Sequence, residues 1–557
     1  MNYDYIIVGA GSAGCILANR LTASGKHTVL LVEAGGKDSS FWFKVPVGFT
    51  KTYYNETYNW MYYSEPEKEL DNRSIYCPRG KVQGGSGSIN AMVYVRGQRH
   101  DFDDWAKAAG DQGWSYEGVL PYFRKLESHP LGNTKYHGAD GPIGITPMKE
   151  GAHPIVHTFL KGCEQLGYRR NEDFNGEQID GAGIYDLNTK NGQRASSSFM
   201  YLHPVLGRPN LTVERDALVT RVRFDEKKRA VGIALTQHGK PREFTASKEV
   251  IMAAGAVDTP KLLQLSGVGS EALLAKYNVP LVHELPAVGQ NLQDHLCVSF
   301  YFRANCKTLN DEMRPLLGKL KMGLQYLLTR KGPLSMSVNQ GGGFFKGDES
   351  LEHPNLQLYF NPLSYRIPKS NKASLEPEPY SGFLIAFNPC RPTSRGSIEI
   401  GSNRAEDAAK IRINALTTKK DIDEAIQGSI LIRKLMTAPA LKDITIEEIS
   451  PGPRCKTEAD MLKYFRENSG SIYHLCGSCT MGDDAATSVV DARLKVHGIE
   501  GLRIVDASVF PNVTSGNINA ATMMVAEKGA EMILDDAKAS AQRDSDAARA
   551  SEALHSH

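Results

Sequence analysis

The first 33 residues constrain the fold of this chain more than any other stretch. A β-branched run at 4–8 leads into glycines at G-x-G-x-x-G spacing across 9–14, and an apolar helical pattern follows. A second strand pattern at 29–32 then ends in Glu33. In a βαβ unit such glycines permit a tight turn, backbone approach to a pyrophosphate and close helix packing, while the terminal acid binds an adenosine ribose. The sequence therefore predicts a dinucleotide site, and the negative charge of Glu33 disfavours the 2′-phosphate of NADP.

Composition excludes several classes of protein. The chain has 557 residues, of which 41% are hydrophobic and 23% charged, as is typical of a soluble globular protein with several domains. Its net charge of +2 gives no general attraction to nucleic acid, so no nucleic-acid partner is expected. Nine cysteines without disulfide spacing, the absence of a basic leader pattern and the absence of an apolar run of about 18 residues favour a cytoplasmic location. No metal site is predicted.

Three further glycine-rich segments have the patterns of ligand sites. Small residues are dense across 80–90, which indicates backbone packed against a flat ligand. At 250–269 a buried strand pattern, a glycine turn and a helix pattern follow one another. At 501–533 a strand pattern ends in Asp506, and a loop and an apolar helix come next. Ligands bind at the carboxyl ends of strands in such arrangements, so each segment is expected to contribute to a ligand site.

Taken together, these segments resemble the glucose–methanol–choline (GMC) oxidoreductases, flavoproteins that oxidise alcohols. The stretch 80–103 is similar to the first signature of that family and 255–269 to its second, with Gln83 departing from the aliphatic residue usual in the first. The N-terminal motif and the stretch 506–527 match as well, so the resemblance covers nearly the whole chain. It implies an α/β fold in which a Rossmann-like FAD-binding domain is joined to an α+β substrate domain built on an antiparallel sheet.

The resemblance also implies a domain organisation. The FAD-binding domain is expected to be discontinuous and to comprise 1–155, 205–298 and 466–536. The substrate domain is expected to comprise 156–204 and 299–465.

Local patterns agree with this division. Strand patterns at 356–360 and 398–400, with helical stretches near 316–328 and 421–436, suit an antiparallel sheet with helices on one side. The polar segment 537–557 is expected to be a flexible tail.

The cofactor implied by the family is FAD. The residues expected to bind it lie in and beside the four glycine-rich segments, and they are Gly9, Gly11, Ser12, Ala13, Gly14, Glu33, Ala34, Gly84, Gly85, Ser86, Asn90, Ala91, Met92, Val93, Val219, Ala254, Gly255, Asp506, Ala507, Asn517, Asn519 and Ala520. The helix that starts near Ala520 is expected to place its N-terminus at the N1–C2=O edge of the flavin, because a helix N-terminus favours negative charge. Some relatives attach FAD covalently through a histidine just before the asparagine of the first signature. That position is Ile89 here, which predicts non-covalent FAD.

Oxidation of an alcohol requires a base of near-neutral pKa beside the flavin, and histidine is the natural residue. Of the 15 histidines, His474 matches the catalytic histidine of the family. Asn517 matches its partner position, where relatives carry asparagine or histidine, and Asn519 is the alternative if the loop is offset by two residues. His474 is expected to take the hydroxyl proton and Asn517 to hold the same oxygen. A core histidine and a helix-capping asparagine are the structural alternatives.

Cys476 and Cys479 have the C-x-x-C spacing of a redox motif. Their surroundings lack the βαβ context of such motifs, and a cysteine at 479 fits the usual pattern of the family, so a structural role is favoured. Relatives commonly carry Pro-Val where this chain has Leu475 and Cys476, a difference that affects the pocket beside His474.

The function implied by the resemblance is FAD-dependent oxidation of a primary alcohol to the aldehyde. The stretch 90–97 resembles family members that act as choline, aliphatic-alcohol or polyethylene-glycol dehydrogenases more than it resembles glucose oxidase. The substrate is then a small-molecule alcohol and the electron acceptor a quinone or another carrier, with O₂, and therefore an oxidase, as the first alternative. A flavin photodecarboxylase and a non-catalytic FAD-binding protein are further alternatives. Which alcohol is used and which oligomer forms stay open at this point.

One helical pattern indicates a further contact. Residues 314–331 hold six leucines together with five lysines and arginines. An apolar stripe with a basic face is typical of helices that lie on membranes, so peripheral membrane contact and a membrane-associated location are conceivable. An ordinary solvated helix that covers the active site explains the pattern equally well.

Overall fold

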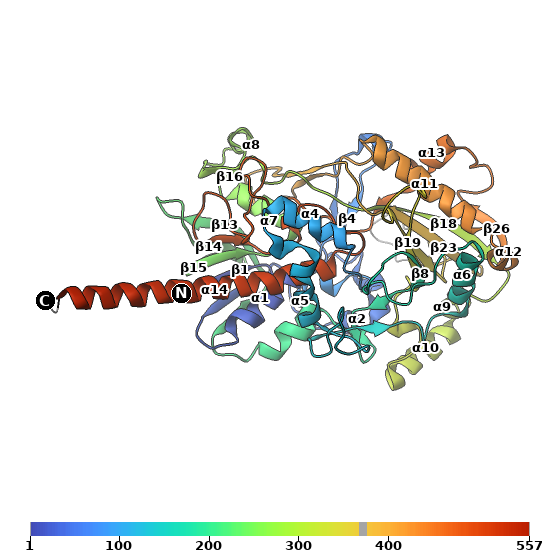
Figure 1. The fold of residues 1–557 in the computed structure, drawn as a ribbon, viewed down its shortest axis with the longest axis horizontal. Coiled ribbons are helices and arrows are strands. Elements are labelled where there is room, and N and C mark those ends of the chain that lie inside the picture. Colours follow the sequence, from blue (N-terminus) through green and yellow to red (C-terminus); the bar gives the residue numbers. More distant parts are fainter. Residues whose placement is uncertain (1, 367–375, 556–557) are drawn as a thin grey trace.

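The structure, a computed structural model, describes residues 2–366 and 376–555. Two seven-stranded sheets lie towards opposite ends of the body of the molecule, and the C-terminal helix projects beyond the first of them (Figure 1). Most of the residues predicted to bind the cofactor and the substrate lie between the two sheets.

The first sheet contains the predicted βαβ unit. Its parallel part consists of β1 and β2 with strands from later in the chain, whereas β13, β14 and β15 form an antiparallel meander. Because the carboxyl ends of parallel strands meet at one edge, the residues that follow them, such as Gly9, Glu33 and Ala253, lie together there. The strands run in the order β12 (Leu211–Glu214), β2 (Val29–Val32), β1 (Asn2–Val8), β15 (Lys240–Met252), β14 (Ala230–Gln237) and β13 (Ala217–Phe224), with β28 (Leu502–Ile504) also paired to β15.

The second sheet has antiparallel neighbours throughout and two different faces. Side chains alternate along a strand, so Phe300 and Leu358 enter a hydrophobic core while Ser299 and Tyr359 point to the other side. The second face forms the wall of a cavity. The strands run in the order β26 (Thr445–Ser450), β18 (Leu296–Ala304), β23 (Gly382–Pro389), β20 (Leu356–Asn361), β19 (Gly341–Phe345) and β8 (Gly181–Ile184), with β27 (Gly470–Ser471) paired to the start of β18.

Several predicted helices lie where the patterns placed them. α1 (Ser12–Thr22) follows the glycine turn, and α10 (Leu316–Thr329) and α11 (Lys419–Leu435) match the stretches expected to be helical in the second half of the chain. α11 packs on β23 from the core side of the second sheet, as an amphipathic helix over an antiparallel sheet should.

Two elements differ from the sequence-based expectation. β24 (Ser397–Glu399) pairs with β25 (Lys410–Arg412) in a small separate sheet and not with the main one, because it packs against α7 (Gly255–Leu265). α14 (Asn519–His555) continues far beyond residue 533, so the segment expected to be a flexible tail is largely helical. Its many alanines, with lysine, arginine and glutamate, are strong helix formers, which outweighs the lack of an apolar stripe.

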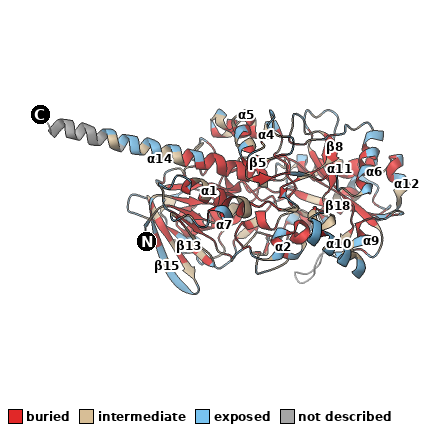
Figure 2. Ribbon diagram, turned by 90° about the horizontal axis from the view of Figure 1, so that it is seen from below, coloured by how far each residue is buried: buried red, intermediate tan, exposed pale blue. Residues whose placement is uncertain are grey.

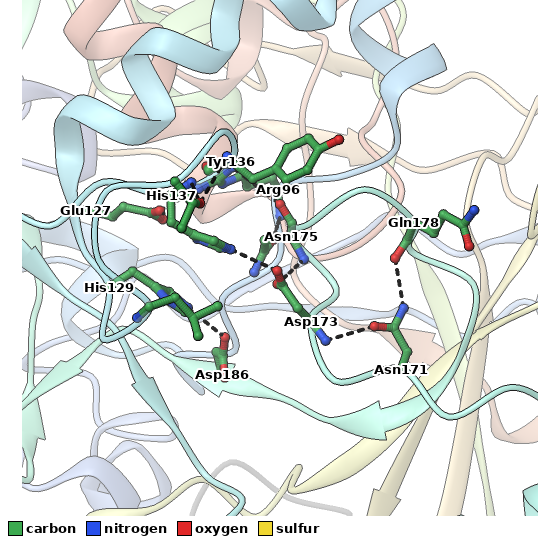
Figure 3. Close-up of polar contacts among 12 residues, drawn as sticks. Arg96, Glu127, His129, Tyr136, His137, Asn171, Asp173, Asn175, Gln178 and Asp186 are labelled. Atoms are coloured by element: carbon green, nitrogen blue, oxygen red, sulfur yellow. Dashed lines mark hydrogen bonds and ion pairs between the residues drawn. The ribbon is translucent and has the colours of Figure 1, made fainter.

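A buried ionic network joins the first signature, at Arg96, to the chain that follows it (Figure 3). Arg96 and His137 contact the carboxylate of Glu127 at 2.6 and 2.9 Å, and His137 also contacts Asp173 at 2.9 Å. Burial would raise the pKa of Glu127, but the charge of Arg96 and the hydrogen bonds from His137 and Arg96 lower it to about 2. Burial would lower the pKa of His137, but its hydrogen bonds to Asp173 and Glu127 raise it to about 9.

These pKa values make the stabilising effect of the network depend on pH. The lowered carboxyl pKa stabilises the fold above the ordinary value of 4.5, and the raised imidazole pKa stabilises it below the ordinary value of 6.5. We therefore expect Glu127→Gln to cost about 3–5 kcal/mol at pH 5.5, and less as the pH rises towards 9 and His137 loses its proton. Thermal unfolding of both proteins across this range measures the difference. A difference that stays constant with pH would contradict the assignment.

Candidate active site

A cavity of about 1400 Å³ lies between the carboxyl edge of the first sheet and one face of the second. Its volume exceeds the ~300–1,000 Å³ typical of a pocket for one small ligand. Gly9, Glu33 and Ala254 belong to the wall from the first sheet, and Tyr359 and Ala386 to the wall from the second. The cavity therefore has room for a dinucleotide together with a substrate.

Most residues predicted to bind the cofactor line this cavity. They are Gly9, Gly11, Ser12, Ala13, Glu33, Ala34, Gly85, Ser86, Asn90, Ala91, Met92, Val93, Val219, Ala254, Gly255, Asp506, Ala507, Asn517 and Asn519. Gly14, Gly84 and Ala520 lie behind the wall. A Cβ on Gly14 would lie 1.9 Å from the carbonyl oxygen of Gly9, so this glycine serves the close packing of α1 on the turn. The amide of Gly84 donates to the carbonyl of Ala10 at 2.7 Å, and Ala520 is buried in the first turn of α14.

The glycine turn directs the N-terminus of α1 at the cavity. Gly9 has a φ of 103°, in the left-handed region, and a Cβ there would lie 2.5 Å from the carbonyl oxygen of Ala253. α1 begins at Ser12 with neither a side-chain cap nor an acidic residue in its first turn. Amides at such a helix N-terminus bind phosphate groups. The turn therefore fits the pyrophosphate of a dinucleotide.

Glu33 stands at the end of β2 on the same wall. Its carboxylate accepts from the backbone amides of Ala10 at 2.9 Å and Gly35 at 2.8 Å. Burial outweighs these two hydrogen bonds and raises its pKa to about 7. The two amides hold the carboxylate at the cavity edge, where it fits the hydroxyl groups of a ribose.

Asp506 joins the ends of two parallel strands. Its Oδ2 accepts from the amide of Gly255 at 2.8 Å and from the hydroxyl of Thr259 at 2.7 Å. α14 then begins at Asn519, whose Oδ1 accepts from the hydroxyl of Ser12 at 2.8 Å. The N-termini of α1 and α14 therefore meet at the cavity, where their dipoles favour negatively charged cofactor atoms.

His474 and Asn517 meet in the cavity wall. The Nδ2 atom of Asn517 lies 3.2 Å from Nε2 of His474. Asn519, the alternative partner, is engaged at the N-terminus of α1 instead. Burial, followed by the influence of His295 and Arg79, holds the pKa of His474 well below its ordinary value of 6.5. Its imidazole is therefore neutral at neutral pH.

A chain of hydrogen bonds fixes which nitrogen of His474 carries its hydrogen. The carbonyl oxygen of Cys390 can only accept, so His295 donates to it through Nε2 at 2.7 Å. Burial lowers the pKa of His295 to about 4, so this ring is neutral and its Nδ1 is an acceptor. The Nδ1 atom of His474 lies 2.9 Å from it and must carry the hydrogen. The lone pair of His474 Nε2 is left to accept from the amide of Asn517.

Two further side chains hold this arrangement in place. Gln357 donates through Nε2 to Oδ1 of Asn517 at 3.4 Å, which turns the amide nitrogen of Asn517 towards His474. Asp294 accepts from the backbone amide of His474 at 2.8 Å and also contacts the hydroxyl of Ser471. Burial raises the pKa of Asp294 to about 6.

The sequence patterns did not point to His295, Asp294 or Gln357. A signal exists for the first two, because polar residues at 290–295 stand immediately before the alternating strand β18. Gln357 is a polar residue near the start of β20, and its contact with Asn517 is what identifies it as part of the site.

Cys476 and Cys479 are fully buried. Burial raises the pKa of both thiols well above the ordinary value of 9. Because the thiolate is the reactive form, these surroundings favour the structural role over the redox one.

Two sequence profiles of the GMC oxidoreductases match the chain, the N-terminal one over residues 3–297 and the C-terminal one over residues 392–526. The chain is also 41% identical over 538 residues to the oxygen-dependent choline dehydrogenase of Vibrio vulnificus (strain YJ016), covering 96% of this chain and 94% of that protein. The chain belongs to the GMC oxidoreductases.

Further relatives support the same family membership. An oxygen-dependent choline dehydrogenase of Escherichia coli O17:K52:H18 is 40% identical over 541 residues, covering 96% of each protein. The solved structure of pyridoxine 4-oxidase from Mesorbium loti has a TM-score of 0.85 at 28% identity and covers 95% of this chain and 98% of its own. Formate oxidase has a TM-score of 0.88 at 26% identity, with coverage of 96% and 99%.

The expectations about fold and cofactor are thereby confirmed. This GMC oxidoreductase has the α/β fold with an antiparallel second sheet, and it is an FAD-dependent enzyme that acts on CH–OH groups. Within residues 2–366 and 376–555, no helix combines the length and the hydropathy needed to cross a membrane.

Proposed function

We propose that this GMC oxidoreductase oxidises a primary alcohol to the aldehyde, with His474 as proton acceptor and Asn517 as the group that holds the hydroxyl oxygen. One observation supports this above all. The Nε2 lone pair of His474 faces the amide of Asn517 on the wall of a cavity that also contains the dinucleotide-binding turn. A base, a hydrogen-bond donor and a cofactor site therefore share one space.

Asn517, His474 and His295 have separate roles in proton transfer. A substrate hydroxyl placed between the two side chains accepts from Nδ2 of Asn517 and donates to Nε2 of His474. When the proton moves to Nε2, the hydrogen bond from Nδ1 to His295 keeps the ring in its orientation. His474 is 6% exposed, so the reacting oxygen is shielded from bulk water. Bound FAD supplies the acceptor for the hydride that leaves the alcohol carbon.

Residues of the cavity wall would hold the FAD. The turn at Gly9 and the N-terminus of α1 would bind the pyrophosphate, and Glu33 would bind the ribose. The N-terminus of α14 would lie at the polar edge of the flavin.

FAD is expected to be bound without a covalent link. Ile89, at the position where some relatives carry the linking histidine, packs with Phe43 and Val82 and has no nucleophilic atom. Acid precipitation of the purified protein should therefore release all of the yellow chromophore into the supernatant. Flavin that remains in the pellet would refute the prediction.

The side chains of the cavity wall suit two classes of alcohol substrate. Tyr53, Tyr54, Tyr76 and Tyr473 line the cavity and contact one another, with the ring of Tyr473 5.1 Å from that of Tyr53. Aromatic faces attract a quaternary ammonium group such as that of choline. The apolar side chains of the second sheet suit an aliphatic alcohol instead. We infer choline as the first substrate to test, because Tyr473 directly precedes His474.

The electron acceptor proposed here is a quinone or another carrier, with O₂ as the alternative. Quinones reside in lipid. Reduction of a quinone by this protein would therefore require a peripheral contact of the protein with a membrane.

One experiment tests substrate and acceptor together. The FAD-loaded protein is assayed with choline, aliphatic primary alcohols and a secondary alcohol, and aldehyde, H₂O₂ and reduced quinone are measured. Aldehyde formation with quinone reduction supports the proposal in full, whereas stoichiometric H₂O₂ identifies an oxidase. No aldehyde from any primary alcohol would overturn the proposed function.

A further inference from the structure

The helix α10 presents its apolar residues to solvent. Six leucines of this helix are exposed by 59–80%, and they are Leu316, Leu317, Leu320, Leu324, Leu327 and Leu328. α10 lies at the edge of the molecule, and Figure 2 shows it largely in the colour of exposed residues. Such a concentration is unusual, because single exposed apolar residues are common on soluble proteins but contiguous patches mark binding surfaces.

The leucines form one stripe. At about 100° per residue, the six positions fall within an arc of about 120° of the helix circumference. The opposite side packs on the protein through Met322 and Tyr326, and Tyr326 contacts Val45 and Val47. The helix is therefore fixed to the body by a narrow face and leaves its wider apolar face uncovered.

The charged residues at 314–331 have one sign. Residues 314–331 contain five lysines and arginines and no acidic residue. Lys319 and Lys321 are exposed within the helix itself, and Arg314 and Lys331 are exposed next to its ends. An apolar stripe with a basic rim is complementary to a surface that combines hydrocarbon with negative charge.

Exposed aromatic residues belong to a second element near α10. Phe41 and Trp42 of α2 (Phe41–Lys44) are 46% and 41% exposed, and α2 lies near α10 in both views (Figures 1 and 2). The chain that follows α2 contributes Val45 and Val47 to the cluster beneath Tyr326. Tryptophan at the rim of an apolar surface is typical of proteins that sit at the lipid–water interface.

We propose that α10, with Phe41 and Trp42, docks this protein on the surface of an anionic lipid bilayer. The stripe enters the boundary between headgroups and acyl chains, and the lysines and arginines meet anionic headgroups. Insertion of apolar side chains and attraction by basic residues are two signals that act together, as stable peripheral binding requires. The positive charge at 314–331 disfavours pairing of this face with a second copy of itself.

The docking surface adjoins the active site. Leu309 of α9 (Leu309–Met313), the helix just before α10, packs with Phe49 and Val338, and both of these line the cavity. Docking would therefore bring the cavity close to the lipid in which a quinone resides. The choice of a quinone rests on the proposed function, but docking itself is measured without turnover.

Co-sedimentation with vesicles tests the docking. FAD-loaded protein is mixed with vesicles of phosphatidylcholine alone or with about one-third phosphatidylserine. We expect binding to the anionic vesicles, weakened by added salt, and little binding to neutral ones. Leu320→Glu with Leu324→Glu should lower the apparent affinity at least about tenfold, and Lys319→Glu with Lys321→Glu should lower it on anionic vesicles. Leu131→Glu, at a residue 57% exposed outside this helix, is the matched control and should bind like the unaltered protein.

Several results separate docking from its rivals. Flavin absorbance and activity with a soluble dye show that each variant is folded. If the protein does not sediment with anionic vesicles, or if the leucine variant sediments like the control, the proposal is overturned. If the leucine variant changes only the oligomeric state and not vesicle binding, the apolar face of α10 binds another protein chain. That result would also overturn the proposal. If docking holds but a lipid-embedded quinone is not reduced, docking stands and the proposed acceptor fails.

Discussion

Replacing His474 by alanine is expected to lower kcat by roughly 10²–10⁴ while FAD remains bound. The ring provides the lone pair that faces Asn517, and within the described cavity wall His474 is the histidine placed to take the hydroxyl proton. Without it, the alcohol must lose its proton to water in a site that shields the reacting oxygen. Steady-state turnover with a saturating alcohol measures the loss, and flavin absorbance shows that the cofactor is retained.

A matched control separates a catalytic loss from a general effect of losing an imidazole. His353→Ala removes an exposed histidine that lies outside the cavity wall and should leave turnover unchanged. A loss below tenfold in His474→Ala, with flavin bound normally, would exclude His474 as the base.

The second large effect is expected at His295, which does not reach the cavity wall. Leucine at this position removes the acceptor for Nδ1 of His474, so the ring is no longer restricted to the tautomer with a free Nε2. We expect kcat to fall on the order of 10²-fold, because a catalytic imidazole held in the wrong tautomer loses most of its activity. KM should change little, since His295 is fully buried away from substrate.

Glutamine at 295 distinguishes this positioning role from a structural one. Its amide can donate to the carbonyl of Cys390 and accept from His474, so His295→Gln should recover much of the activity that His295→Leu loses. Tm and FAD content report on folding in both variants. Equal activity of the two variants at equal stability would show that the tautomer is not what His295 controls.

The sequence could predict those parts of the site that depend on local spacing. The turn across Gly9, Gly11 and Gly14 and the acid at Glu33 belong to one short βαβ unit, so their geometry follows from a few dozen consecutive residues. The roles of His474 and Asn517 follow from resemblance to the family, and their contact across 43 positions of sequence adds an independent reason to pair them.

Contacts between distant segments could not be predicted in the same way. His295 meets His474 across 179 positions because β27 pairs with the start of β18, and Gln357 of the second sheet meets Asn517, just before α14, across 160 positions. No local sequence pattern predicts these contacts. The strand at 397–399 illustrates the same limit, since alternation in the sequence predicts a strand there but its partner depends on packing against α7.

Anaerobic mixing of the FAD-loaded protein with a primary alcohol tests the central claim most directly, when the alcohol carries either hydrogen or deuterium on carbon 1. We predict loss of the yellow flavin absorbance with formation of one aldehyde per flavin, a slower loss with the deuterated alcohol, and a rate at least a hundredfold lower in His474→Ala, in line with the roughly 10²–10⁴ contribution of a general base. Bleaching of the His474→Ala protein as fast as that of the unaltered protein would contradict the account, as would an unaltered protein that no primary alcohol bleaches.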